Sequence, residues 1–119
     1  MTRRTERVGE QLREELARVL REETTDPRLR LVTLLKVDVA PDLSQALVFW
    51  SVMEAAGAAP VAEVQEGLDG AAGFLRRRLA AELRLRRMPS LSFRHDPSLA
   101  LGARTLALLH EIEDEQKDS

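Results

Sequence analysis

The first part of the chain places apolar residues at steps of three or four positions. The repeating positions between residues 5 and 23 are Val8, Leu12, Leu16, Val19 and Leu20. This spacing predicts an amphipathic helix, and Thr2 or Thr5 is available as its N-cap. Pro27 predicts that the helix ends and the chain turns over residues 24–27, because proline disfavours helical geometry in the residue before it.

The pattern then changes to a period of two. The alternating positions between residues 31 and 40 are Thr33, Leu35, Val37 and Val39, with Lys36 and Asp38 between them. This alternation predicts a half-buried strand. Residues 46–52 are rich in β-forming residues and predict a second strand. The connection over residues 41–44 is short, so the two strands are predicted to form an antiparallel hairpin.

A second helical pattern covers about residues 61–87. At about 100° per residue, one side of this helix carries an apolar stripe formed by Leu68, Ala72, Leu75, Leu79 and Leu83. The opposite side carries Gly70, Gly73, Arg77, Ala81 and Arg84. Glycine in mid-helix costs about 1 kcal/mol relative to alanine, and we expect a bend near Gly73. Pro89 predicts the end of this region.

The last predicted elements are short. Leu91 and Phe93 flank Ser92 as a third strand, and residues 96–98 begin a final helix that runs to Ile112. The predicted fold class is α+β: a single two-layer domain over residues 1–112, in the order α-β-β-α-kink-α-β plus a short C-terminal helix, with a three-stranded sheet packed against the helices. Residues 113–119 form an acidic tail that we expect to be disordered.

Composition excludes several classes of protein. The chain has 119 residues, enough for one core, and it lacks cysteine, which excludes disulfide scaffolds, thiolate metal sites and cysteine nucleophiles. It has no apolar run of the roughly 18 residues that span a bilayer and no signal-peptide core, so we expect a soluble, cytoplasmic protein without a membrane partner. The adjacent pairs His95-Asp96 and His110-Glu111 diverge in direction, and no nucleophile motif, phosphate loop or metal-ligand set accompanies them. We therefore predict no enzyme, no metal and no cofactor.

Charge is distributed unevenly along the chain. The formal net charge is −2, but residues 38–69 hold six acids and no Lys or Arg, whereas residues 73–94 hold seven Arg against one Glu. The local values are therefore −6 and +6. Because local potential steers polyanions, a basic patch can bind RNA on a formally acidic protein.

Nine arginines are the candidate contacts for a polyanion. They are Arg77, Arg84, Arg76, Arg78, Arg86, Arg87, Arg3, Arg4 and Arg7. Arg77 and Arg84 are the strongest candidates, because they are predicted to project between small residues on one helix wall that a phosphate backbone can approach closely. Residues 76–78 spread over about 200° of the helix, so they do not all face one ligand.

The remaining candidates have competing explanations. Arg86 and Arg87 are predicted at the end of the helix, where its dipole also favours positive charge. The arginines at positions 3, 4 and 7 open the first helix, where positive charge opposes the dipole and an external anion would offset the cost. Two alternatives stay open: a solvated helix face, or a protein-interaction module whose arginines dock an acidic partner, including the 38–69 segment of another copy.

Seven segments together resemble bacterial ribosome-binding factor A, a small-subunit assembly factor with a KH-type RNA-binding fold. The segments are residues 7–12, 26–28, 32–39, 42–48, 71–80, 83–93 and 96–98. The resemblance covers nearly the whole chain, and it lies in the order and spacing of fragments that are individually weak. It implies that Ala71, Ala72 and Gly73 form a helix kink in place of the GXXG loop of ordinary KH domains. The literal GXXG at residues 67–70 is interpreted as a coincidence, because Leu68 lies on the apolar stripe.

The resemblance also implies a function. It implies binding to the immature small (30S) ribosomal subunit through 16S rRNA near its 5′-terminal helix, and assistance in late maturation and rRNA 5′-end processing without catalysis. The family is linked to growth in the cold. Ribosomal proteins and an assembly GTPase are further partners that the resemblance allows, and we expect a monomer.

Overall fold

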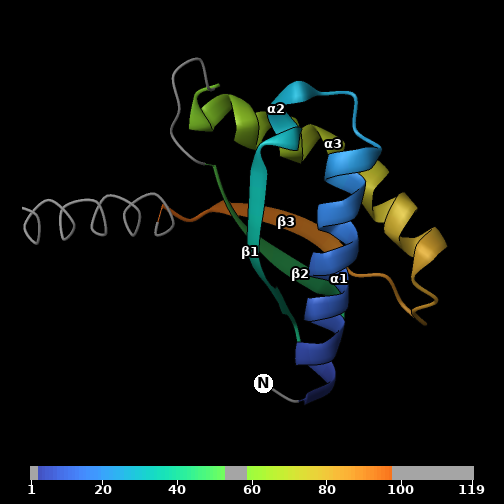
Figure 1. Ribbon diagram of the computed structural model, residues 1–119. Helices are drawn as coiled ribbons and strands as arrows, with labels where there is room; N and C mark the ends of the chain where they lie inside the picture. Colours follow the sequence, from blue (N-terminus) through green and yellow to red (C-terminus); the bar gives the residue numbers. More distant parts are fainter. Residues whose placement is uncertain (1–2, 53–58, 98–119) are drawn as a thin grey trace, which may run out of the picture.

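The computed structural model describes residues 3–52 and 59–97 (Figure 1). In chain order the elements are α1 (Arg3–Glu22), α2 (Pro27–Arg30), β1 (Val32–Val39), β2 (Gln45–Val52), α3 (Val61–Glu82) and β3 (Ser90–His95). The strands form one sheet in the order β1-β2-β3. β1 and β2 are antiparallel, whereas β2 and β3 are parallel because α3 connects them as a crossover. The predicted α+β class and antiparallel hairpin are confirmed.

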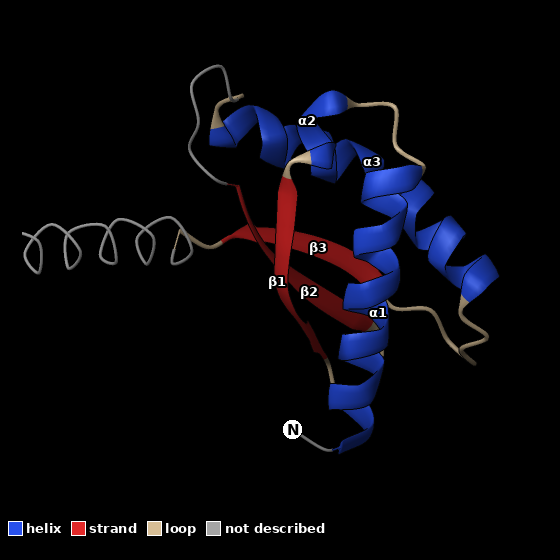
Figure 2. Ribbon diagram, viewed as in Figure 1, coloured by secondary structure: helices blue, strands red, loops and turns tan. Residues whose placement is uncertain are grey.

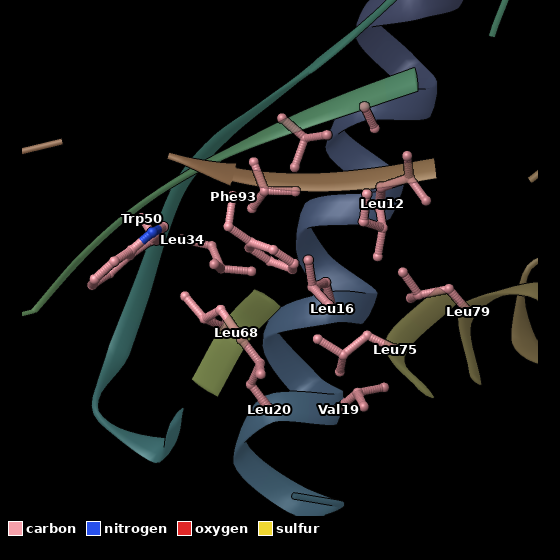
Figure 3. Packing of buried hydrophobic residues seen from close by; sticks show 14 of the residues in the cluster. Leu12, Leu16, Val19, Leu20, Leu34, Trp50, Leu68, Leu75, Leu79 and Phe93 are labelled. Atoms are coloured by element: carbon pink, nitrogen blue, oxygen red, sulfur yellow. The ribbon is translucent and has the colours of Figure 1, made fainter. Parts of the chain in front are cut away.

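The helices and the sheet form two layers around one core. α1 packs against β1, α3 packs against β3, and the two helices also contact each other (Figure 2). Leucines of α1 and α3 point toward Leu34, Trp50 and Phe93 of the three strands (Figure 3). The apolar stripes predicted for both helices are therefore buried, with Leu12, Leu16, Leu68, Leu75 and Leu79 fully inaccessible to solvent. Each such leucine contributes about 1.5–3 kcal/mol of transfer free energy to folding.

A polar link crosses the core between α3 and the sheet. The Trp50 indole Nε1 donates a hydrogen bond to Gln65 Oε1 at 2.8 Å, and Gln65 Nε2 donates to the carbonyl oxygen of Phe93 at 2.8 Å. Trp50 is fully buried and its ring lies 4.8 Å from that of His95, centroid to centroid. Phe49, its neighbour in β2, is only partly buried and lies beneath the ammonium group of Lys36. Core packing is thus confirmed for Trp50.

Replacing Gln65 with alanine is expected to lower the free energy of unfolding by about 1–2 kcal/mol, because the buried indole N–H loses its acceptor. Urea unfolding followed by Trp50 fluorescence measures the loss. Gln65→Glu keeps an acceptor for the indole but replaces the Nε2 donor with a carboxylate oxygen that faces the Phe93 carbonyl and the Asp69 carboxylate, so it is not expected to recover the stability. An alanine variant as stable as the wild type would contradict this role for the link.

The alternation predicted for the first strand is wrong at its N-terminal end. Leu34 is buried and Leu35 is half-buried, whereas the period of two placed Leu35 on the core face. The register of β1 shifts between Leu34, which is opposite Trp50, and Lys36, which is opposite Phe49. Leu35 is the extra residue of this β-bulge, so Leu34 and Val37 both reach the core although they are three positions apart.

Two local predictions about the first helix also need correction. α1 begins at Arg3, so Thr5 lies inside its first turn, where it is buried, and is not the N-cap. The turn after α1 contains the short helix α2, which the prediction lacked. Asp26 caps α2 by accepting a hydrogen bond from the Arg28 N–H, and Pro27 occupies its first position, an arrangement typical of helix starts.

The second helical region is shorter than predicted. α3 ends at Glu82, and Leu83 is already extended, with φ −98° and ψ 115°. The sequence from residue 83 to 86 alternates leucine and arginine, a period of two that suits an extended segment. Leu83 and Leu85 pack against the core while Arg84 and Arg86 are exposed. Residues 71–73 lie inside the one continuous helix.

The third predicted strand is confirmed and is longer than expected, since β3 covers Ser90–His95. The final helix was predicted to begin at residues 96–98 and run to Ile112; from residue 98 onward it lies outside the described residues, as do the tail over residues 113–119 and Thr2. No helix in the described part of the chain is long and apolar enough to cross a membrane.

Candidate nucleic-acid interface

The start of α1, the β1–β2 turn and the segment after α3 meet around one surface hollow of about 450 Å³. It is lined by Arg4, Val8, Asp42, Leu43, Leu85, Arg86 and Arg87, and we call it the arginine hollow. Its arginines are exposed, whereas Val8, Leu43 and Leu85 are partly buried against the core. The hollow therefore combines an apolar base with three guanidinium groups that come from two separate segments.

The β1–β2 turn supplies one wall of the arginine hollow in a strained conformation. Leu43 has φ 61°, which lies in the left-handed region and costs a non-glycine residue about 1–2 kcal/mol. Its N–H donates to the Ala40 carbonyl oxygen at 2.8 Å, and its side chain packs against the core, which offsets that cost. Strain of this kind is often found where a backbone is shaped for binding.

Asp42 is held in place in the same turn. Its Oδ1 accepts hydrogen bonds from Ser44 N at 3.0 Å and from Ser44 Oγ at 2.6 Å. These bonds, and more weakly the positive charge of Arg87, hold the pKa of the Asp42 carboxyl below its usual range. The carboxylate is therefore ionised at neutral pH and limits the positive charge of the hollow on that side.

The segment after α3 owes its position to its alternating sequence. Leu83 and Leu85 turn toward the core, so Arg84 and Arg86 turn to solvent. Arg76 of α3 fixes the end of this segment: its Nη2 donates to the Met88 carbonyl oxygen at 2.8 Å and its Nε to that of Pro89 at 3.2 Å. Arg76 thus has a structural role that its position in the sequence did not reveal.

The first turns of α1 extend the basic surface. Arg3, Arg4 and Arg7 line a neighbouring hollow together with Val8 and Gln11. All three arginines are exposed. Arg4 and Val8 belong to both hollows, so the arginines that open α1 lie beside those at positions 86 and 87. Periodicity could not predict this meeting, because it depends on how the chain folds back.

The exposed wall of α3 carries Arg77. Gly70 and Gly73 are exposed on the same wall, as predicted, and a Cβ atom at Gly73 would lie 3.5 Å from the Arg77 guanidinium. Among the described residues, Arg77 makes no ion pair and no side-chain hydrogen bond. Its charge is available to a ligand.

Arg78 and Arg84 both differ from the sequence-based prediction: Arg78 is bound by protein carboxylates, and Arg84 lies outside the helix. Arg78 binds Glu23, the residue that follows α1, at 2.7 Å and Glu82 at 3.2 Å, and the hydrogen bond to Glu23 is the main reason that its pKa is raised. It therefore ties α3 to the turn that begins after α1. Arg84 is exposed but lies beyond the end of α3, so the prediction that Arg77 and Arg84 share one helix wall is wrong. The alternation in residues 83–86 was the signal that would have separated them.

Other sequence signals have plain structural explanations. The GXXG at residues 67–70 lies within α3 with Leu68 fully buried, which confirms that the match is a coincidence. His95 ends β3, with its ring beside that of Trp50. No group of three or more His, Asp or Glu side chains within residues 3–52 and 59–97 is arranged to hold a metal ion.

The comparison with known families decides the relationship of this chain. Residues 4–109 match the family described as Ribosome-binding factor A. The chain belongs to the ribosome-binding factor A family. Among its relatives, the Ribosome-binding factor A of Marinomonas sp. is 48% identical over 118 residues, which cover 97% of this chain and 92% of that protein. The factor of Pseudomonas syringae pv. syringae is 44% identical over 106 residues, covering 89% and 77% of the two chains.

Solved structures of the ribosome-binding factor A family share the fold. The crystal structure of ribosome-binding factor A from Thermus thermophilus has a TM-score of 0.67 and 27% identity, covering 76% of this chain and 94% of that chain. A homology model of the Thermus thermophilus factor, fitted into a cryo-EM map of a 30S complex, has a TM-score of 0.60 and 28% identity, with 75% and 91% coverage. The KH-like fold expected from the resemblance is thereby confirmed.

Proposed function

We propose that this protein binds the immature small ribosomal subunit and that the arginine hollow is its main contact with 16S rRNA. The observation that carries the proposal is the meeting of Arg4, Arg86 and Arg87, from two separate segments, over an apolar base. Guanidinium forks at fixed positions match phosphate oxygens in pairs, and their stems cover apolar surface. Such a surface recognises the backbone and shape of RNA with little dependence on base sequence.

Family membership supports the finer parts of the proposal. A Thermus thermophilus relative has been fitted into a 30S complex, which supports the same target for this chain. We propose that contact lies near the 5′-terminal helix of 16S rRNA and assists late maturation and 5′-end processing in the cytoplasm, without catalysis. The protein acts as a monomer, and Arg77, Arg84, Arg3 and Arg7 add contacts around the hollow.

Co-sedimentation with purified immature small subunits tests the proposal. The wild type is compared with Arg4→Glu/Arg87→Glu, which reverses the charge of two arginines of the arginine hollow. The control is Arg21→Glu/Arg94→Glu, which makes the same charge change at exposed positions elsewhere. We expect the hollow variant to stay in the supernatant and the control variant to pellet with the subunits. If both variants pellet equally, the hollow is not the rRNA site. If the wild type binds itself but not the subunits, the arginines dock an acidic protein surface instead.

A further inference from the structure

A third hollow, of about 480 Å³, lies between the α1–α2 turn and α3. Its walls include Thr24, Leu29, Gly67, Gly70, Ala71 and Phe74. Phe74 is 39% exposed, one of three large hydrophobic side chains that are exposed in the described part of the chain, with Leu31 and Val61. Of these three, only Phe74 lines this hollow. Phe74 and the small residues Gly67, Gly70 and Ala71 therefore form the α3 wall of this hollow, and the side chains of the α1–α2 turn and α2 form the opposite wall.

The position of Phe74 on α3 joins it to the wall that carries Arg77. Positions 70, 73, 74 and 77 follow the i, i+3, i+4, i+7 spacing of one helix face. A Cβ atom at Gly70 would meet nothing within 4 Å, and the Arg77 guanidinium lies beside Gly73. A flat ring, an open backbone surface and an unpaired cation are therefore neighbours on one face.

The acidic residues around this hollow do not repel a phosphate as free charges would. Glu23 is paired with Arg78 at 2.7 Å and with Arg18 at 3.3 Å. Asp26 is paired with Arg28 at 2.7 Å. Arg77 does not line the hollow, but it lies on the same face of α3 as Phe74, and with no such partner among the described residues it supplies uncompensated positive charge there.

We infer that Phe74 stacks on one unpaired RNA base in this hollow while Arg77 binds a phosphate of the same strand. The inference rests on the proposed function and names its substrate class more closely: RNA with a nucleotide displaced from the helical stack, not a continuous duplex. Stacking on one phenylalanine tolerates every base, because every base has a π-face, so it is compatible with recognition that is independent of sequence. A protein segment seated on Phe74 is the competing occupant, and the charge of Arg77 beside an open helix backbone favours the nucleotide.

Photo-crosslinking on the small subunit identifies the class of occupant. p-Benzoylphenylalanine replaces Phe74 in the full chain bound to immature subunits, and a matched variant carries it at Leu31, which is 67% exposed and does not line the hollow. We expect position 74 to crosslink to 16S rRNA and position 31 to give a different product. A crosslink from position 74 to a ribosomal protein, or no crosslink from a bound protein, overturns the inference but leaves subunit binding, and hence the proposed function, intact.

A solution assay tests stacking directly. A short single-stranded RNA containing 2-aminopurine, and the duplex of the same sequence, are titrated with wild type, Phe74→Tyr, Phe74→Leu, Gly70→Ala and Gly70→Leu proteins at low salt. Stacking quenches 2-aminopurine, so we expect quenching of the single strand by the wild type, Phe74→Tyr and Gly70→Ala. Phe74→Leu should lose the quenching and about 10-fold in affinity, the effect of removing one stack. Gly70→Leu should do the same by filling the hollow.

The outcomes of this assay are decisive in both directions. Circular dichroism and Trp50 fluorescence verify that each variant is folded. Equal quenching by Phe74→Leu and the wild type, a preference for the duplex, or no quenching by the wild type each overturns the inference. Failure of the proposed function is seen separately, as equal subunit binding by the arginine-hollow variant and its control.

Discussion

Alanine at position 9 is expected to lower the free energy of unfolding by about 2–3 kcal/mol, although alanine is the best helix former. Gly9 lies in α1 where the helix crosses β1. A Cβ atom there would lie 2.4 Å from the Val37 carbonyl oxygen, and 3.6 Å from a methyl carbon of Val39. The clashing atom belongs to the backbone of the sheet and cannot turn away as a flexible side chain can. The helix and the strand must therefore separate, which loosens the packing of Leu12 and Val37.

Gly70 of α3 is the matched control. It too lies within a helix, but the space around its Cβ position is empty, so Gly70→Ala is expected to raise the free energy of unfolding by about 1 kcal/mol. Urea unfolding followed by Trp50 fluorescence measures both changes. Opposite signs from the same substitution would establish that close approach, and not helix propensity, fixes glycine at position 9. A stabilising Gly9→Ala would refute that explanation.

Much of the fold follows from periodicity because each long element buries one face. The three-and-four spacing in α1 and the apolar stripe of α3 identified the core leucines, since these elements meet the sheet along most of their length. The hairpin was predicted equally well. Predictions were wrong where a short stretch fitted two periodicities. Because residues 34 and 35 are both leucine, the pattern did not show which of them faces the core or that a bulge occurs there. The alternation over residues 83–86 was interpreted as part of the preceding helix.

The candidate site was less predictable than the fold. Charge composition located the basic segment, but it could not tell which guanidinium groups bind protein carbonyls or carboxylates. Arg76 binds the Met88 carbonyl oxygen, 12 positions away in the chain, and Arg78 binds the Glu23 carboxylate, 55 positions away. The meeting of Arg4 with Arg86 and Arg87 likewise depends on tertiary packing. Helical spacing alone would have placed Phe74 on the same wall of α3 as Arg77. Its exposure could not be predicted, because it depends on where the α1–α2 turn packs.

Salt is expected to weaken the complex with the immature subunit by about 100-fold between 50 mM and 200 mM monovalent salt, if four phosphates are contacted. The reason is that each arginine that binds a phosphate releases condensed counterions, and the logarithm of affinity falls with the logarithm of salt by about 0.9 for each contact on a duplex. The four contacts counted here are the three arginines of the arginine hollow and Arg77, and phosphate contacts of Arg84, Arg3 and Arg7 would steepen the slope further. Fluorescence anisotropy of labelled protein, titrated with subunits at several salt concentrations, measures the slope.

Neutralising the arginine hollow should then change the slope itself. In Arg4→Gln/Arg86→Gln/Arg87→Gln we expect the slope to fall by about 3, because three phosphate contacts are lost. Arg21→Gln/Lys36→Gln/Arg94→Gln removes the same net charge from exposed positions outside the hollow and should keep the wild-type slope. Equal slopes in the two variants would mean that only the overall charge of the protein matters. A flat slope in the wild type would mean that the contact with the subunit is not made through phosphates, and the acidic-partner alternative would then explain the arginines better.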